Sequence, residues 1–197
     1  MSSHFFALFS RMKYIDRWSL MRNTDPESLS QHSFDVAAVA HSLAVIGNKR
    51  LNKSYDEGKI ALMGMYHDMP EIITGDMPTP VKYHNEEIRA AFGSIEKAAQ
   101  KSLLSTLPPD LRDAYKQLII PDEKGEEYRL VKAADKISAL IKCMQEERGG
   151  NTEFIKAKQS TLESLHNMNC EEAEIFLEEF LESYSLVLDT VLKETEE

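Results

Sequence analysis

The sequence predicts a single all-α domain of about seven to eight helices over residues 1–197. Apolar residues recur three and four positions apart through most of the chain, which is the spacing of amphipathic helices. Runs of β-branched residues are few, and the glycines and prolines that end helices fall between the periodic segments. The length also fits one domain, for which about 100–200 residues are usual.

The expected helices follow one another without a linker or an internal repeat. The first covers residues 3–20, with Phe5, Phe9 and Met12 on its apolar side. Ser28 or Ser30 can cap a second helix that ends at Gly47, a residue suited to a helix C-terminus. The others are expected at about 56–74, at 84–106, in a short segment ending at 119–120, and at 125–147, 152–166 and 171–194.

Composition and charge exclude several classes of protein. No run reaches the ~18 apolar residues that a membrane span needs, so we expect no membrane partner. The net charge of −10 argues against a nucleic acid polymer as a partner, because phosphate neutralisation supplies most of that affinity. Cys143 and Cys170 stand far apart with no second pair, which indicates reduced thiols and a cytoplasmic location.

Charge is unevenly distributed along the chain. Residues 171–197 hold ten acidic residues and one lysine, which indicates a solvated, acidic C-terminal helix at about 171–194. Residues 1–23 are instead basic, and a patch of this size could hold one phosphate group.

His32 lies on a helix face that should be buried. It shares one stripe with Val36, Val39 and Leu43, because successive helix residues are about 100° apart. His41 lies nine positions further on and points to the opposite side, so it cannot join a cluster with His32. A lone histidine on such a stripe is most often a hydrogen-bonded core residue.

A second polar group follows the apolar stretch 60–66. His67, Asp68 and Glu71 share one sector at the end of the expected third helix. Burying these charges without a partner costs several kcal/mol. A metal cation would remove that cost, as would an arginine with a second histidine. The alternative interpretation is an N-cap or a surface acidic cluster.

The expected helix at 125–147 repeats this pattern. Asp135 shares a face with Val131 and Ser138, and Lys132 on the same helix is its simplest partner. A metal-binding core over about residues 28–145 would collect two imidazoles and two carboxylates, which suit Mn²⁺, Co²⁺, Zn²⁺ or Fe²⁺. Three helices would supply these four ligands: His32, His67, Asp68 and Asp135.

These residues resemble a known family. The His32…His67-Asp68…Asp135 series is similar to the HD-domain metal-dependent phosphohydrolases, which form an all-α bundle. A closer resemblance, to bacterial 5′-deoxynucleotidases of the YfbR type, covers almost the whole chain and weakens over about 108–128 and at the C-terminus. It rests on Arg17-Trp18, on Leu20-Met21-Arg22-Asn23, on Met65-Tyr66-His67-Asp68 and on the stretch from Thr74 to Tyr83.

The resemblance implies hydrolysis of 2′-deoxynucleoside 5′-monophosphates by a cytoplasmic homodimer with one divalent metal ion. Cobalt or manganese is expected first, with zinc, iron and copper as alternatives. The implied catalytic residues are Glu71 as acid, Arg17 as the phosphate-orienting group and Asp76. The implied substrate contacts are Arg17, Trp18, His32, Asp76, Met77, Pro78, Thr79 and Asp135, and the implied metal ligands are His32, His67, Asp68 and Asp135.

Other interpretations of single residues stay open. Arg17 could instead pair with Asp16 or another acid, and Trp18 could be a core residue. The family commonly has a glutamate where this chain has Gln31, so a carboxylate that would orient His32 is missing. Asp76 and Thr79 could bond the sugar 3′-hydroxyl and leave the 2′ side to a steric gate.

Two other functions are also compatible with the sequence. A triphosphohydrolase or a phosphodiesterase of cyclic nucleotides or alarmones would need more basic residues near the site than the chain offers. A non-catalytic helical interaction module would need none of the five polar residues that are present together.

Overall fold

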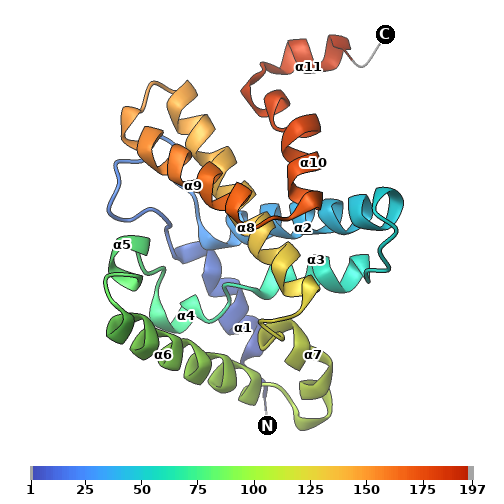
Figure 1. Cartoon of the computed structure of the whole chain (residues 1–197). Coiled ribbons are helices and arrows are strands. Elements are labelled where there is room, and N and C mark those ends of the chain that lie inside the picture. Colours follow the sequence, from blue (N-terminus) through green and yellow to red (C-terminus); the bar gives the residue numbers. More distant parts are fainter. Residues whose placement is uncertain (1, 195–197) are drawn as a thin grey trace.

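The computed structural model describes residues 2–194, which form an all-α fold as predicted (Figure 1). The α-helices are α1 (Phe5–Phe9), α2 (Leu29–Arg50), α3 (Glu57–Tyr66), α4 (Glu71–Thr74), α5 (Thr79–Lys82), α6 (Glu86–Ser105), α7 (Arg112–Ile119), α8 (Glu126–Arg148), α9 (Ile155–Asn167), α10 (Glu171–Phe180) and α11 (Leu188–Glu194). Short 3-10 helices are η1 (Ser10–Tyr14), η2 (Pro109–Leu111), η3 (Thr152–Phe154) and η4 (Glu182–Ser185). The helices outnumber the expected seven to eight because several expected helices are interrupted.

The first expected helix, at 3–20, is shorter than predicted. It ends with η1 at Tyr14, and Ile15 is extended. The Arg17 N–H then donates to the Glu27 carbonyl at 3.0 Å, and the Leu29 N–H donates to the Ile15 carbonyl at 2.8 Å. Residues 15–29 therefore form a loop closed on itself, which brings Arg17 back to the start of α2.

The second expected helix begins as predicted but continues past Gly47. Ser28 caps α2 in a reciprocal pair with Gln31, whose side chain accepts from the Ser28 N–H at 2.8 Å. Gly47 lies inside α2, where the Tyr55 ring packs so closely that a Cβ atom would come within 2.5 Å of it. This glycine therefore allows a close approach instead of ending the helix.

The expected helix at 56–74 is broken in two. Asp56 caps α3 by accepting from the Lys59 N–H at 2.9 Å, as predicted for this start. Pro70 then interrupts the helix, since proline lacks the N–H that a helix interior needs. The chain turns after Tyr66 and resumes as α4 at Glu71.

The expected acidic helix at 171–194 is also broken. α10 buries Ala173 and Phe176, whereas Tyr184, Val187 and Leu188 further along are exposed. The serines of η4 have low helix propensity, and this turn packs against α8, where Arg148 donates to the Leu186 carbonyl at 2.9 Å. Figure 1 shows α11 standing away from the other helices.

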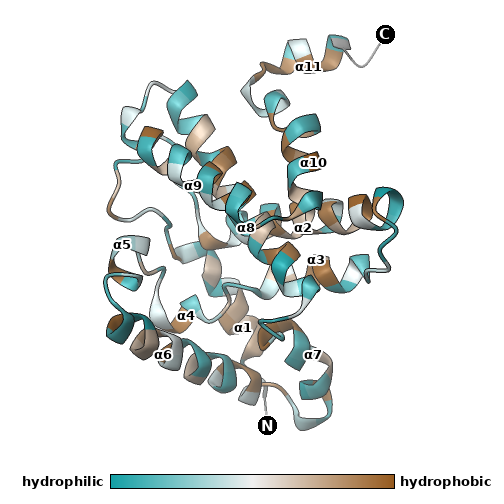
Figure 2. Cartoon of the chain, viewed as in Figure 1, coloured by the Kyte–Doolittle hydropathy of each residue, from teal (hydrophilic) through white to brown (hydrophobic). Residues whose placement is uncertain are grey.

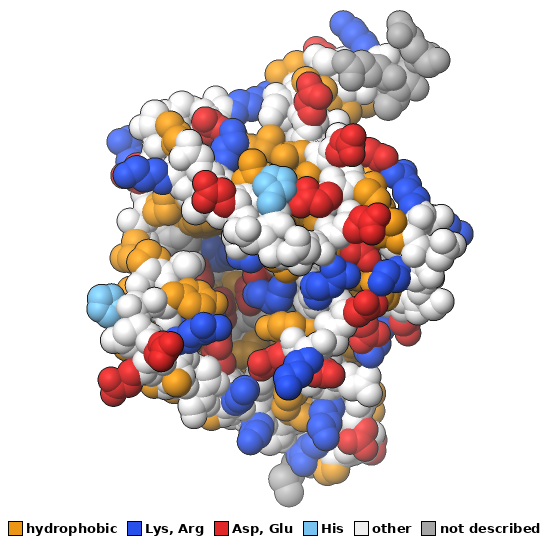
Figure 3. Space-filling view, viewed as in Figure 1, with side chains coloured by type: hydrophobic (Ala, Val, Ile, Leu, Met, Phe, Trp, Pro, Cys, Tyr) orange, Lys and Arg blue, Asp and Glu red, His pale blue; other side chains and the backbone are white. Residues whose placement is uncertain are grey.

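Hydrophobic residues gather where α3, α8 and α10 come together, and hydrophilic residues line much of α9 (Figure 2). The face drawn in Figure 3 is hollowed between the part formed by α5 and α6 and the part formed by α8 and α9. Acidic and basic side chains lie within this hollow. No helix in residues 2–194 combines the length and the apolar character needed to cross a membrane.

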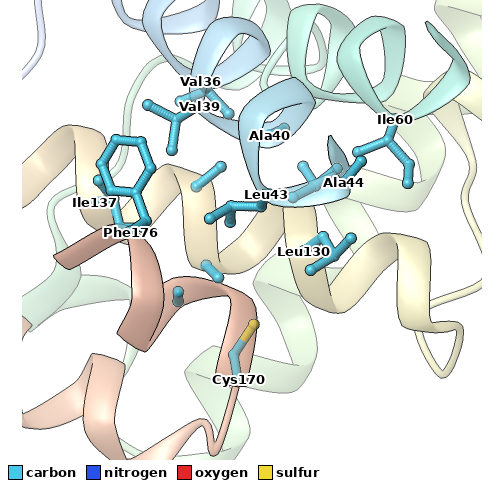
Figure 4. Packing of buried hydrophobic residues seen from close by; sticks show 14 of the residues in the cluster. Val36, Val39, Ala40, Leu43, Ala44, Ile60, Leu130, Ile137, Cys170 and Phe176 are labelled. Atoms are coloured by element: carbon cyan, nitrogen blue, oxygen red, sulfur yellow. The ribbon is translucent and has the colours of Figure 1, made fainter. Parts of the chain in front are cut away.

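The main core holds α2 against α3, α8 and α10 (Figure 4). Full burial of one such aliphatic side chain contributes about 1.5–3 kcal/mol relative to exposure. Both cysteines lie in buried positions as free thiols, as predicted. The packed residues include Val36, Leu43, Ile60, Leu130, Ile137 and Phe176.

Candidate active site

Side chains from α2, from the turn after α3 and from α8 meet beside this core. The packing of α2 between α3 and α8 fixes their relative positions, as a precise site requires. One potential ligand atom from each side chain lies within 4.8 Å of all the others. The four residues are those singled out from the sequence: His32, His67, Asp68 and Asp135.

The distances in this group, which we call the His/Asp cluster, are short. The Nε2 atom of His32 lies 3.3 Å from Asp135 Oδ1 and 3.5 Å from Asp68 Oδ2. The Nε2 atom of His67 lies 3.0 Å from Asp68 Oδ2 and 3.9 Å from Asp135 Oδ1. His32 is fully buried on α2, whereas His41 is exposed, as the helical spacing predicts.

Both histidines present Nε2 to the centre of the cluster. His67 Nδ1–H donates to the Gly64 carbonyl at 2.7 Å, which leaves the lone pair on Nε2. His32 Nδ1 lies 3.1 Å from the Ser138 hydroxyl, which orients that ring in the same way. Both Nε2 atoms are buried without a hydrogen-bond partner. Two unpartnered imidazole nitrogens beside two carboxylates fit a divalent cation.

Electrostatics keep both carboxylates ionised. Burial raises the pKa of Asp68, but His67 and His32 outweigh burial and hold it well below its usual range. For Asp135, burial likewise raises the pKa, while Lys132 and the histidines hold it well below the usual range. Burial and the charge on Arg17 lower the pKa of His32, yet the two carboxylates raise it above its ordinary value.

Asp135 has two partners at once. Its Oδ2 accepts from Lys132 at 2.7 Å, the partner expected from the sequence, while its Oδ1 faces the histidines. The ion pair and the place in the cluster are therefore compatible.

Glu71 opens α4 beside the His/Asp cluster. The break at Pro70 means that it does not share one continuous helix with His67, contrary to the prediction. Its Oε2 is buried and has no hydrogen-bond partner. Burial, together with the charges on Asp68 and Asp76, raises the pKa of Glu71 to about 10. This raised pKa favours the protonated form of the carboxyl group, which is the form a general acid needs.

Arg17 lies in the closed loop before α2 and pairs with Glu27. Its Nη1 donates to Glu27 Oε2 at 2.8 Å, so its acidic partner is not the adjacent Asp16. Burial lowers the pKa of Arg17, but nearby carboxylates, Glu27 first and then Asp135 and Asp68, raise it above its usual value. The guanidinium group thus lies within the electrostatic reach of the cluster.

Trp18 combines a core contact with an unusual backbone. Its ring centroid lies 5.2 Å from that of Phe154, which agrees with the core interpretation. Its φ of 59° is left-handed, a conformation that costs a side-chain-bearing residue about 1–2 kcal/mol. Its Nε1–H donates to Glu27 Oε2 at 3.0 Å.

The loop from Asp76 to Thr79 approaches the site only in part. Burial raises the pKa of Asp76 above its usual value despite the opposing charge of Arg17, so this carboxyl group lies within electrostatic reach of the guanidinium group. Met77 and Pro78 are half-buried and Thr79 is exposed at the start of α5. Among the contacts found in residues 2–194, none joins these three to the cluster, so their substrate role stays a prediction.

Two residues that contact the predicted site, Ser138 and Glu27, were not predicted as part of it. Ser138 was only a face marker, yet its hydroxyl orients His32. Glu27 directly precedes the Ser28 cap and lies ten positions after Arg17, so no local pattern in the sequence joined the two residues. Gln31, by contrast, is exposed and bonds Ser28, so the absence of a glutamate there removes no contact to His32.

Comparison with known proteins gives the same class as the geometry. A solved HD-domain phosphohydrolase from Listeria innocua matches 92% of this chain and 88% of its own at a TM-score of 0.81 and 22% identity. An HD phosphohydrolase of cyanophage S-2L, DatZ, solved with dA and one catalytic Zn²⁺, matches 90% of this chain and 96% of its own at a TM-score of 0.66 and 16% identity. The chain therefore has the fold of the HD-domain phosphohydrolases, with the His/Asp cluster at its centre.

The family within this class follows from closer relatives. The family described as "5′-deoxynucleotidase YfbR-like" matches residues 4–184. A 5′-deoxynucleotidase of Enterobacter sp. strain 638 is 45% identical over 194 residues, which cover 98% of each chain. The chain therefore belongs to the YfbR-like 5′-deoxynucleotidases and is an enzyme of the phosphomonoester hydrolase class.

Proposed function

We propose that the chain hydrolyses 2′-deoxynucleoside 5′-monophosphates to a deoxynucleoside and phosphate, with one divalent metal ion held by the His/Asp cluster. The observation that carries this proposal is the pair of buried, unpartnered Nε2 atoms facing two ionised carboxylates. The name of the Enterobacter relative and the dA and Zn²⁺ in the cyanophage structure support the substrate class and the metal.

Each side chain then has a defined task. A bound divalent ion would neutralise phosphate oxygens and lower the pKa of a water. Arg17 offers a planar guanidinium group that can bind two phosphate oxygens. Glu71, whose pKa is raised by burial and by neighbouring carboxylates, would donate a proton to the leaving 5′-oxygen of the sugar.

Asp76 is suited to the sugar. Its carboxylate lies near Arg17, so it could accept a hydrogen bond from the 3′-hydroxyl while the phosphate is held. We assign Trp18, Met77, Pro78 and Thr79 to the walls around the nucleoside, where contact at the 2′ carbon would exclude ribose. Equal cleavage of ribo- and deoxyribonucleotides would contradict this gate.

The charge balance favours one phosphate over three. Lys82 is paired with Glu96 at 2.6 Å, and Lys132 is paired with Asp135. Arg17 is also paired, with Glu27, but only through Nη1, and its buried Nε has no partner. Of these three cations it is therefore the one best placed to hold a single phosphate, which disfavours a triphosphohydrolase. Release of pyrophosphate or triphosphate from a nucleotide would contradict the monophosphatase proposal.

The test is a phosphate-release assay on chelator-treated protein. Deoxy- and ribonucleoside monophosphates are offered with Co²⁺, Mn²⁺, Zn²⁺, Fe²⁺ or Cu²⁺. We expect phosphate from deoxynucleotides only when a metal is restored, with Co²⁺ or Mn²⁺ most effective. No metal-dependent phosphate release with any deoxynucleotide would refute the proposed function.

We also propose a cytoplasmic homodimer. Phe6 and Phe34 are exposed by 56% and 67%, and Phe34 borders an apolar groove of about 200 Å³ between η1, α2 and α3. The free, buried cysteines agree with a reducing compartment. Light scattering should give twice the chain mass, and Phe34→Asp should give the monomer; a monomeric unmodified chain would contradict the dimer.

A further inference from the structure

We infer that Glu27 is a positioning residue that holds the Arg17 guanidinium group and the Trp18 ring in the geometry needed for substrate binding. This inference rests on the proposed function and goes beyond the roles assigned there. Glu27 is not one of the four residues of the His/Asp cluster. Its role follows from the geometry of the loop before α2.

One carboxylate oxygen joins the two side chains. Glu27 Oε2 accepts from Arg17 Nη1 at 2.8 Å and from Trp18 Nε1 at 3.0 Å. The Glu27 carbonyl also accepts from the Arg17 N–H at 3.0 Å. The carboxylate and the guanidinium group are only 11% and 12% exposed, so water competes weakly for these bonds.

The bond to Nη1 decides which edge of the guanidinium group remains for a ligand. The Nε atom of Arg17 is buried and has no partner. The Nε and Nη2 donors lie on one edge and can bind two oxygens of a phosphate together. Because Glu27 engages Nη1, that two-donor edge is left for the oxyanion.

The backbone at this point needs such support. Trp18 is left-handed at φ 59°, a state that a bulky residue keeps only when its surroundings fix it. The Met21 N–H and the Asn23 side chain bond the Trp18 carbonyl, at 2.9 Å and 3.3 Å. The Trp18 side chain packs against Phe154, and Glu27 supplies its hydrogen-bond acceptor from across the closed loop.

The distances argue against a direct hydrogen bond from His32, one of the metal-ligand candidates, to Glu27. Its Oε1 lies 3.9 Å from His32 Nδ1, beyond hydrogen-bond length, whereas the Ser138 hydroxyl lies 3.1 Å from that nitrogen. The role of Glu27 is therefore expected to act through Arg17 and Trp18.

The test compares Glu27→Ala and Glu27→Gln with Glu153→Gln. Glu153 is the matched control, because it is exposed and accepts from the Arg22 N–H of the same loop at 2.6 Å. We expect kcat/KM for a deoxynucleoside monophosphate to fall about 10- to 100-fold in Glu27→Ala. Glu27→Gln keeps one acceptor oxygen and should lose less, and Glu153→Gln should equal the unmodified enzyme.

Three readouts separate positioning from general damage. Trp18 is the single tryptophan of the chain, so its fluorescence should become easier to quench with acrylamide in Glu27→Ala. Affinity for Co²⁺, measured by calorimetry, should stay unchanged. The Glu27→Ala loss should largely vanish in an Arg17→Ala background, because the group that Glu27 positions is then absent.

The inference is overturned if Glu27→Ala keeps full activity, if its loss adds independently to that of Arg17→Ala, or if weaker Co²⁺ binding accounts for the whole loss. An unmodified enzyme that releases no phosphate would instead refute the proposed function, so the two failures are distinguishable.

Discussion

Neighbouring carboxyl groups in this site have pKa values that are shifted in opposite directions. Asp68 pairs with two imidazoles, and its pKa is held well below the usual range. Glu71, three residues on, is buried beside the like charges of Asp68 and Asp76, which raise its pKa to about 10. When their surroundings push the pKa values of two carboxyl groups apart, one is suited to bind a cation and the other to donate a proton. Asp68 and Glu71 can thus take these two roles although they are only three residues apart.

Replacing Glu71 should slow the chemical step without removing the metal. Glu71→Gln fills the same space but cannot donate the acidic proton, so kcat should fall about 10²- to 10⁴-fold. Because the acid works below its pKa, wild-type activity should decline as pH rises toward about 10, or at a lower pH once a cation lies nearby. Stopped assays from pH 6 to pH 10 and Co²⁺ calorimetry measure both effects; an unchanged kcat would contradict the acid role.

Residue types and helical spacing were enough to predict the cluster. The stripes of His32 and Asp135 and the apolar run before His67 each identified an inward polar group. Glu27 could not be found in this way, because it acts across a loop whose closure depends on the left-handed Trp18 and on backbone bonds between residues 15–17 and 27–29.

At the scale of elements, the helix starts were predicted better than the helix ends. Ser28 and Asp56 are caps because a short polar side chain before an apolar run accepts a backbone N–H. Gly47 was expected to end α2, but the helix continues to Arg50. The glycine instead leaves room for the Tyr55 ring, a tertiary contact that the local sequence does not reveal. The break in the C-terminal segment likewise reflects tertiary packing, since Phe176 in α10 is buried whereas Val187 and Leu188 near the start of α11 are exposed.

Gly47 provides a test of this packing. Gly47→Ala places a methyl group 2.5 Å from the Tyr55 ring and should destabilise the fold by about 1–3 kcal/mol. Gly93→Ala on α6 is the control, since no atom lies within 4 Å of its added Cβ, and it should stabilise by about 0.5–1 kcal/mol. Urea unfolding measures both; equal stabilisation would contradict the Gly47 contact.

α8 also stabilises the loop that carries Arg17. Buried Glu146 accepts from Lys142, from the Thr24 and Asp25 N–H groups, and from Asn151 at 2.7 Å. Burial raises the pKa of Glu146, but these donors outweigh it and hold the pKa well below the usual value. This network ties residues 24–25 to the helix that bears Asp135.

Glu146→Gln should therefore destabilise the fold by about 3 kcal/mol at pH 7, because it leaves Lys142 without its buried charge partner. Because the pKa of Glu146 is lower in the folded protein than in the unfolded chain, its charge stabilises the fold at pH values above the unfolded pKa of 4.5. This stabilisation is lost as the pH falls from 4.5 toward the folded-state pKa. The difference from wild type in urea unfolding should thus shrink on acidification from pH 5 to pH 3. The exposed Glu147→Gln is the control, and a gap that widens in acid would contradict the network.

For the molecule as a whole, the all-α class and the residues of the site could be predicted from the sequence, but the way in which the helices pack against one another could not. The order α2, α3 and α8 around one core brings together side chains more than 100 positions apart. Periodicity predicts which face of each helix is buried, but not which helices pack side by side. The prediction that three segments share one cluster came from the cost of burying each polar group alone, and the family resemblance agreed with it.

A cation bound jointly by α2, the turn after α3, and α8 should stabilise the whole fold. Bound at about 100 times its Kd, it adds about 2.7 kcal/mol, which for a chain of this size corresponds to about 5–10 °C in Tm. Calorimetric melting with Co²⁺ and with a chelator should show this shift in the unmodified chain and not in Asp135→Asn. An equal shift in both proteins would indicate a metal site elsewhere.

The most direct measurement is an anomalous difference map at the cobalt edge, from crystals grown with Co²⁺. It should show one peak about 2.0–2.2 Å from Nε2 of His32 and of His67 and from one oxygen each of Asp68 and Asp135. A fully occupied peak at another position, with none among these four side chains, would contradict a cation bound jointly by α2, the turn after α3, and α8.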